Sequence, residues 1–214
     1  MAISKSLLLK KVSGRIEDLI VYERNGQTCL RRAPEKGTVK LTPGMKEQQE
    51  RWAGVAAFYQ AVKAAGLERS WRRAAEGTRL SGYNLFVRRH QMAFTKEGRA
   101  GDLGRLAVTV GSVGLPDGLR VSAREGRTVT VEWQAGERYP DGVEDDRLVV
   151  VLAEQGEGWR VEVAETGVWK RKEGRAVVRL PPEWADAEGM FCFFQRESGE
   201  VSESVYLSIH FLNF

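Results

Sequence analysis

The spacing of hydrophobic residues changes near residue 100 of this 214-residue chain. Between residues 46 and 65, apolar side chains recur at steps of three and four, which is the spacing of a helix with one buried face. After residue 101, short β-branched and aromatic runs alternate with Gly, Pro and charged breaks, a pattern typical of antiparallel strands. The sequence therefore predicts an α+β protein whose helices precede most of its strands.

A β-hairpin is predicted before the helices, from Asp18 to Arg32. Its two β-prone flanks enclose Asn25-Gly26, a dipeptide that favours the positive φ angles of a type I′ turn. Since a two-stranded ribbon alone is only marginally stable in water, it needs a helix, a second domain or another chain to lie on. We expect it to act as a docking arm. The candidate residues of this arm are Tyr22, Arg24, Asn25, Gly26, Arg31 and Arg32.

Three short helices are predicted between the hairpin and residue 100, forming a small helical unit. Thr42 is an N-cap candidate before Pro43, and the first helix runs from there to about residue 65. A second helix spans 67–75, and Ser81 caps a third. The residues expected on the buried stripe of the first helix are Trp52, Val55, Ala56, Tyr59 and Val62.

Short strands are predicted over residues 101–214. The stretch 128–133 alternates so that Val129, Val131 and Trp133 face a core while the residues between them face water. Such spacing favours an antiparallel β-sandwich. The predicted strands are 106–110, 119–123, 128–133, 148–153, 159–163, 168–171, 176–180, 190–195 and 205–211.

The strand region resembles a fibronectin type III domain. Residues 128–133 resemble the second strand of that fold with its core tryptophan, and residues 176–182 with 190–194 resemble the strand, proline-bearing loop and aromatic strand that close it. The tyrosine that the fold carries near the start of the aromatic strand is missing, and Phe191 is the nearest candidate. The resemblance implies an Ig-like fold and no particular activity.

The first 95 residues resemble an uncharacterised family of small bacterial proteins, some of them phage- or prophage-like. The family runs from a Ser-Gly-Lys start through an Arg-Asn-Gly hairpin, an Arg-x-x-Pro segment and a Thr-Pro-x-x-x-x-Gln-x-x-x-Arg helix to a Gly-Tyr-Asn-x-Phe helix. The resemblance implies the order of these elements and no activity. The matching residues are Ser13-Gly14-Arg15, Arg24-Asn25-Gly26, Arg31-Arg32-Ala33-Pro34, Thr42-Pro43, Gln48 or Gln49, Arg51 and Gly82-Tyr83-Asn84-Leu85-Phe86.

Charge is unevenly distributed along the chain. The net charge is +4, yet residues 1–100 hold 20 basic against 9 acidic residues, and residues 101–214 hold 13 against 20. We therefore expect a basic domain over 1–100, with the hairpin and helices, and an acidic β-sandwich domain over 105–214. Opposite charges favour different partners for the two domains, or copies that attract one another head to tail. The alternative is that both surfaces are simply solvated.

No arrangement of residues in the sequence predicts a reaction centre. His90 and His210 stand alone, so we interpret His90 as a satisfied, half-buried ring of the third helix and expect no metal site. Cys29 and Cys192 are too few for a disulfide framework and are expected to be free thiols. The acidic loop 141–146 is interpreted as solvated, with a Ca²⁺ site as the alternative. We expect no catalytic residue and no cofactor, and hence a non-enzymatic protein.

Membrane insertion is not predicted. No apolar run approaches the roughly 18 residues that a span requires, and Leu7-Leu8-Leu9 is too short for the core of a signal peptide. We therefore expect synthesis in the cytoplasm, with a final place there or in a virion or other particle.

Two functions fit these observations. The first is a structural or assembly protein of a virion-like or other multi-copy particle, which docks on protein partners or on its own copies. The second is a cytoplasmic nucleic-acid-binding protein, because arginines interleaved with Trp71, Tyr83 and Phe86 suit phosphate contacts and base stacking. In either case the candidate residues of the basic face are Arg69, Arg72, Arg73, Arg79, Arg88 and Arg89.

Overall fold

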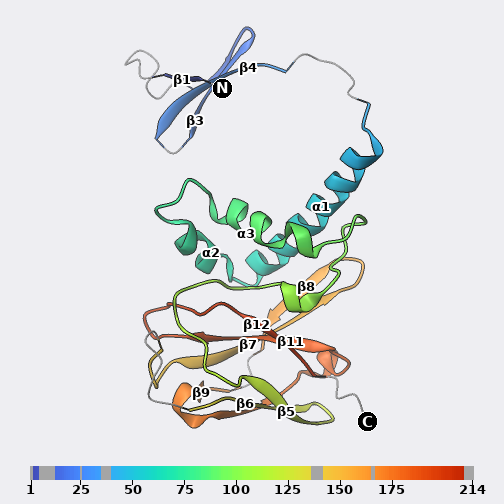
Figure 1. Cartoon of the computed structure of the whole chain (residues 1–214), viewed down its shortest axis with the longest axis vertical. Helices are drawn as coiled ribbons and strands as arrows, with labels where there is room; N and C mark the ends of the chain where they lie inside the picture. The colour runs from blue at the N-terminus through green and yellow to red at the C-terminus, as the bar shows by residue number, and fades with distance from the viewer. Residues whose placement is uncertain are drawn as a thin grey trace. The chain divides into compact units, whose positions relative to one another are not determined.

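The computed structural model describes residues 2–4, 13–24, 26–34, 40–135, 142–164 and 167–209. The chain divides into two compact units, residues 1–42 and 43–214 (Figure 1). Within the described residues, the protein is an α+β mixture of three α-helices and three antiparallel sheets. The division at residue 42 differs from the boundary near residue 100 that the charge distribution led us to expect.

The unit of residues 1–42 contains an antiparallel sheet with the strand order β1-β4-β3-β2. The predicted hairpin is confirmed, because β3 pairs with β4 in the register that places Arg24 opposite Gln27. Gly26 has a φ of 73°, whereas Asn25 lies outside the described residues. The strands are β1 (Ala2–Ser4), β2 (Gly14–Ile16), β3 (Leu19–Arg24) and β4 (Gln27–Arg32).

The hairpin is not the isolated ribbon that the sequence suggested. β2 pairs with β3 on one side, and β1 pairs with β4 on the other. Three or more strands are far more stable together than a ribbon of two. The hairpin is therefore supported by β1 and β2 of its own unit, two strands that the sequence did not predict.

Three α-helices begin the unit of residues 43–214. They are α1 (Pro43–Ala64), α2 (Glu68–Ala75) and α3 (Gly82–His90), close to the predicted ranges. The Ser81 cap is confirmed, since its side chain accepts a hydrogen bond of 3.2 Å from the backbone N–H of Asn84. Short 3₁₀ turns lie at Gln91–Ala93, Leu103–Arg105, Arg171–Glu173 and Pro182–Trp184.

Two antiparallel sheets follow the helices. One has three strands in the order β10-β6-β5; in the other the order is β12-β11-β7-β8, with β9 also paired to β7. The predicted strand 106–110 is wrong, because this segment forms no strand. The strands are β5 (Arg120–Glu125), β6 (Thr128–Glu132), β7 (Arg147–Gln155), β8 (Trp159–Val163), β9 (Trp169–Lys170), β10 (Arg175–Arg179), β11 (Gly189–Gln195) and β12 (Val205–Ser208).

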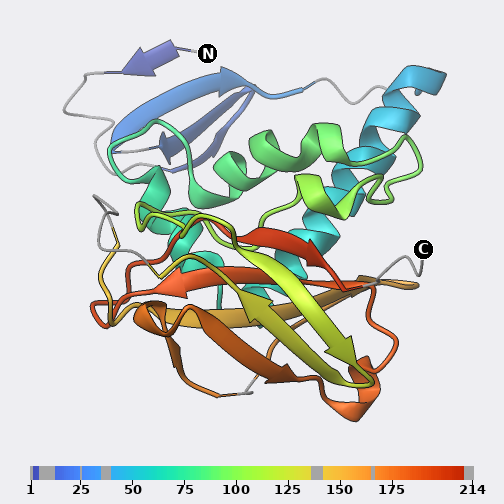
Figure 2. The ribbon, with the colours of Figure 1, turned by 60° about the horizontal axis from the view of Figure 1, so that its bottom comes forward.

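The five-stranded sheet is covered on both faces. Along β7 and β11, Val150 and Cys192 belong to a core shared with the three-stranded sheet, which also contains Val129 and Val131 as predicted. The neighbouring side chains on each strand point the other way, toward the helices, because successive residues of a strand face opposite sides. Figure 2 shows the resulting layers of this unit, with the five-stranded sheet between the helices and the three-stranded sheet.

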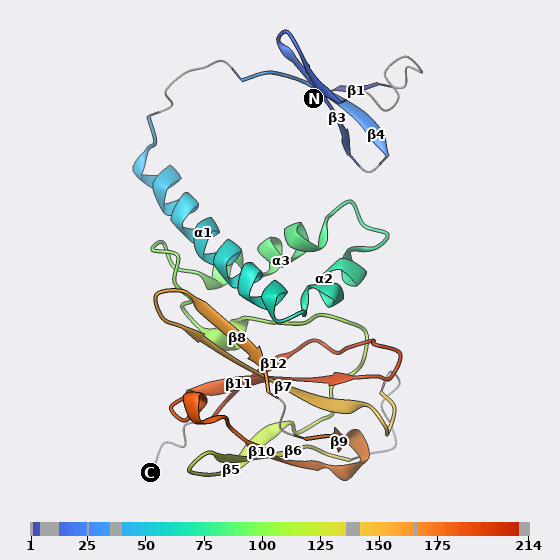
Figure 3. The same cartoon turned by 180° about the vertical axis from the view of Figure 1, so that it is seen from behind.

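The helices belong to the same compact unit as the strands because they share a core with the five-stranded sheet. Phe58 of α1 packs on Trp159 of β8, with ring centroids 4.4 Å apart, where Figure 3 shows α1 above β8. Eight- and nine-residue helices cannot enclose a core of their own, so they depend on this sheet.

Trp52 does not join that core, contrary to the prediction. Its side chain is 54% exposed, whereas the buried residues of α1 begin at Val55. Helical spacing therefore identified the correct stripe but not the point along α1 at which packing begins.

Candidate functional site

The six arginines of the predicted basic face all lie in the helical layer of residues 43–214. All six are exposed at the surface. Arg69, Arg72 and Arg73 belong to α2, Arg79 lies in the connection between α2 and α3, and Arg88 and Arg89 belong to α3.

Two of these arginines hold the helices to the strand region of the same chain. Arg73 Nη2 lies 3.1 Å from Glu200 Oε1, and Arg89 Nη2 lies 2.5 Å from Glu203 Oε1. Both glutamates belong to the segment between β11 and β12. Each half-exposed pair contributes at most about 1 kcal/mol, so both arginines are partly neutralised by carboxylates of the same unit without contributing much to its stability.

The other four arginines differ in their pairing. Arg72 pairs within α2, with Nη2 lying 3.3 Å from Glu68 Oε1. Among the described residues, Arg69, Arg79 and Arg88 form no ion pair. The predicted face is thus divided into arginines that pair with carboxylates of the same chain and arginines that form no ion pair among the described residues.

The charge asymmetry between residues 1–100 and 101–214 is largely balanced within the unit of residues 43–214. Residues 43–100 hold 11 basic and 5 acidic residues, and residues 101–214 hold 13 and 20. These opposite charges lie in one compact unit, whose net charge is −1. The basic excess of the chain instead lies in residues 1–42, with 9 basic against 4 acidic residues, a net charge of +5.

The predicted docking arm lies in β3 and β4. Arg24, Arg31 and Arg32 are exposed, Tyr22 is half-buried, and Asn25 lies outside the described residues. Gly26 follows Asn25 in the connection between β3 and β4.

A cross-strand row of exposed residues runs over this sheet. Ile16 of β2 lies opposite Leu19 of β3, which lies opposite Arg32 of β4. Residues directly opposite one another project on the same face of a sheet. Ile16 is 53% and Leu19 46% exposed. The result is an apolar pair beside a cation, which we call the docking row (Ile16, Leu19 and Arg32).

His90 is fully buried, not half-buried as predicted. Its Nδ1–H donates to the carbonyl of Phe86 at 2.8 Å, and its Nε2 accepts from the backbone N–H of Ala107 at 3.0 Å. Aromatic rings of α1, α2 and α3 surround it, so burial lowers the pKa of His90 to about 4. The imidazole is a neutral structural link between α3 and the segment after it.

The acidic loop is only partly solvated. Asp145 pairs with Lys170 and Lys172 at the surface, which lowers the pKa of its carboxyl group. Asp146 is 1% exposed, accepts a hydrogen bond from the N–H of Val143, and pairs with Arg171 and Arg196. For Asp146 the interpretation as a solvated loop is wrong, because its carboxylate is a buried partner of two guanidinium groups. Asp141 lies outside the described residues.

Both cysteines are free thiols, as predicted, and both are buried. Burial in the core between the two sheets raises the pKa of Cys192 to about 12. Among the described residues, no group of three or more His, Cys, Asp or Glu is placed to hold a metal ion. No helix in the same residues is long and apolar enough to cross a membrane.

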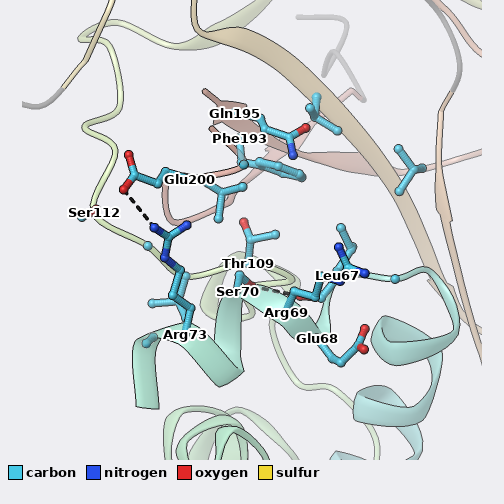
Figure 4. A pocket seen from close by; sticks show the side chains of 18 of the residues that line it. Leu67, Glu68, Arg69, Ser70, Arg73, Thr109, Ser112, Phe193, Gln195 and Glu200 are labelled. Carbon is cyan, nitrogen blue, oxygen red and sulfur yellow. Dashed lines mark hydrogen bonds and ion pairs between the residues drawn. The ribbon is translucent and has the colours of Figure 1, made fainter. Parts of the chain in front are cut away.

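A pocket of about 990 Å³ lies between α2 and the five-stranded sheet. Arg69 and Arg73 of the predicted face line it, whereas Arg72, Arg79, Arg88 and Arg89 do not. In Figure 4, the α2 side chains lie on one side of the pocket and Phe193 and Gln195 on the other, with the Arg73–Glu200 ion pair between the two sides.

No local pattern in the sequence indicates this pocket, because its lining comes from segments spread between residues 63 and 201. One available signal was the apolar character of successive residues in 148–153 and 190–194, which indicates strands buried on both faces. Strands buried on both faces predict that helices cover the sheet. They do not predict which part of the sheet the helices leave uncovered.

Comparison of the chain with protein-family models, with curated proteins and with solved structures finds no match.

Proposed function

We propose that this protein is a non-enzymatic structural or assembly component that forms multi-copy assemblies. In this proposal the sheet of residues 1–42 of one copy docks on the acidic strand region of the next copy. The observation that carries the proposal is the docking row on a separate compact unit with a net charge of +5.

The docking row has the composition of an interface. Exposed large apolar residues that adjoin one another mark interaction sites more often than scattered ones do. Ile16 and Leu19 lie side by side, and Arg32 supplies the planar cation that is enriched at interfaces. Arg15 and Arg31, both exposed, lie opposite Ile20 and so project from the other face of the sheet. Arginines therefore project from both faces of the sheet, while the exposed turn between Ile16 and Leu19 carries Glu17 and Asp18.

Charge complementarity supports another copy as the partner. Residues 101–214 have a net charge of −7, of which the helices of the same unit compensate +6. An added positive unit of +5 is attracted to the carboxylates exposed on the strand side. Such a contact joins two different surfaces, so it is heterologous and generates rings or open filaments.

Two further expectations from the sequence, the fibronectin type III-like sandwich and the particle setting, form part of this proposal. Residues 105–214 would form a fibronectin type III-like sandwich that presents a surface to the outside of the assembly. The docking arm and the opposed charges favour a virion-like or other multi-copy particle as the setting.

Nucleic-acid binding by the helical layer is the second candidate function. It is supported by Arg69, Arg79 and Arg88, which are exposed and form no ion pair among the described residues. Exposed arginines bind phosphate groups without regard to sequence. The two candidates use different residues, so mutation separates them.

Light scattering of the nuclease-treated full chain tests the first proposal. We expect the wild-type protein to form particles larger than one chain, and a Leu19→Thr/Arg32→Glu variant to remain a monomer. Threonine retains the strand propensity of position 19 while the apolar contact is lost. Arg79→Glu is the matched control, since it reverses an exposed arginine outside the docking row, and it should assemble like the wild type.

Three results would overturn the proposal. One is a wild-type monomer at every protein concentration. Another is an assembly that persists in the Leu19→Thr/Arg32→Glu variant. The third is a monomer that changes mass only when short duplex DNA is added and no longer does so after Arg69→Gln/Arg79→Gln/Arg88→Gln substitution, a result that would establish the second candidate instead.

A further inference from the structure

We propose that the pocket between α2 and the five-stranded sheet binds a small amphipathic carboxylate, with an unbranched apolar chain and one negative head group. This site lies within residues 43–214 and does not depend on the docking row. It therefore stands or falls separately from the proposed function.

Part of the pocket surface is apolar, beside polar residues such as Thr109 and Gln195. Val149, Val163 and Phe193 come from β7, β8 and β11, on the face of the sheet that is turned toward the helices. Leu67 and Val201 extend this surface on either side. All except Phe193 are only half-buried, because the helices leave this end of the sheet partly uncovered. An apolar chain placed here would remove these side chains from water.

One wall of the pocket is held in place by backbone contacts. The N–H of Val113 donates to the carbonyl of Val201 at 3.2 Å. Gly111 passes so close to that carbonyl that a Cβ atom at this position would lie 2.0 Å from the oxygen. The wall is therefore formed in advance of any ligand, which reduces the entropy lost on binding.

The charges at the pocket favour an anion. Its acidic residues are Glu68 and Glu200, and both are already paired, with Arg72 and Arg73 respectively. The remaining charged side chains of the lining are Lys63 and Arg69, and neither forms an ion pair among the described residues. Two cations beside an apolar surface match one carboxylate on an apolar chain.

The size of the pocket is consistent with a small molecule. Its volume of about 990 Å³ is near the upper end of the range for small-molecule sites, roughly 300–1,000 Å³. Such sites combine an apolar lining with a few polar groups that fix the orientation of the ligand. Here those groups are Lys63 and Arg69, at the ends of α1 and α2 that face the pocket.

Calorimetric titration of the full chain with sodium hexanoate, octanoate and decanoate tests the apolar part of the site. Each added CH₂ group that is buried should raise the affinity up to about fourfold. We expect saturable binding of one molecule per chain that tightens with chain length. Decanol has the same chain as decanoate without the charge and should bind at least about tenfold more weakly. The carboxylates are used below the concentrations at which they form micelles, and decanol below its solubility limit.

Two double variants test the head group. Lys63→Gln/Arg69→Gln should weaken decanoate binding by about tenfold and leave decanol binding unchanged. Arg79→Gln/Arg88→Gln is the matched control, because it removes two exposed arginines that do not line the pocket. Circular dichroism establishes that both variants are folded.

The proposal is overturned by a wild-type chain that shows no saturable decanoate binding. It is also overturned by affinities that do not rise with chain length, or by equal losses in both double variants. The first two results would show that the apolar surface takes no chain, and the third that the anion is attracted only by overall charge.

Discussion

Acidification should destabilise the unit of residues 43–214 through His90. The imidazole is buried, donates from Nδ1 to Phe86 and accepts at Nε2 from Ala107, so it is neutral in the folded chain. Burial lowers its pKa from 6.5 to about 4. A second proton would occupy Nε2 and break the hydrogen bond with Ala107.

The sign of the effect follows from proton uptake. As the pH falls through 6.5, the unfolded chain binds a proton at His90 and the folded chain does not, so the free energy of unfolding decreases. The loss continues until the pH reaches the folded pKa of about 4. One pKa unit is worth about 1.4 kcal/mol, so the full loss is about 3 kcal/mol, of which about 2 kcal/mol falls between pH 7.5 and pH 5.

Urea unfolding followed by tryptophan fluorescence measures this loss selectively. All six tryptophans of the chain lie between residues 52 and 184, so the signal reports on the unit of residues 43–214. His90→Gln should be less stable at pH 7.5, but it should lack the His90 component of the loss toward pH 5. His210 lies outside the described residues, and a His210→Gln variant, which removes the other histidine, should retain the His90 component of the loss. Identical pH dependence in the wild type and His90→Gln would refute the reasoning.

Two further substitutions have expected effects on stability in the same assay. Asp146→Asn should destabilise by about 3 kcal/mol, because it removes the buried carboxylate that pairs with the buried Arg171 guanidinium, whereas Arg196 also pairs with Glu200. Asp145→Asn, at the exposed neighbour, should change little, and equal effects would contradict the buried role of Asp146. Gly54→Ala should cost about 1–3 kcal/mol, since its Cβ would lie 2.1 Å from the carbonyl oxygen of Gly98. Gly44→Ala, also in α1 but with nothing within 4 Å of its Cβ, should be neutral or slightly stabilising. A Gly54→Ala variant as stable as the wild type would contradict the close approach of α1 to the backbone at Gly98.

Local patterns predicted most of the secondary structure. The start of α1 at Pro43, the Ser81 cap of α3 and the register of Arg24 opposite Gln27 all depend on residues near one another in sequence. The alternating burial of Val129 and Val131 follows from strand geometry alone. Such features are fixed by local chemistry, and so they can be predicted from a single sequence.

The errors concern contacts between distant segments. Arg73 and Glu200 are 127 residues apart, so no local pattern indicates that the basic helices and the acidic strand region attract each other within one unit. The exposure of Trp52 depends on where the sheet ends beneath α1, and the support of the hairpin depends on pairing with β1 and β2. The pocket has the same origin, because its lining brings α2 together with three strands.

The central claim is that residues 1–42 of one copy contact the strand region of another. A photo-crosslinking amino acid at Leu19 tests it most directly, in a mixture of isotopically light and heavy chains that have been treated with nuclease. We expect mixed-isotope crosslinks that join position 19 of one chain to residues 101–214 of a different chain. Crosslinks that join only positions of the same chain, or no crosslink between chains at all, would contradict the account.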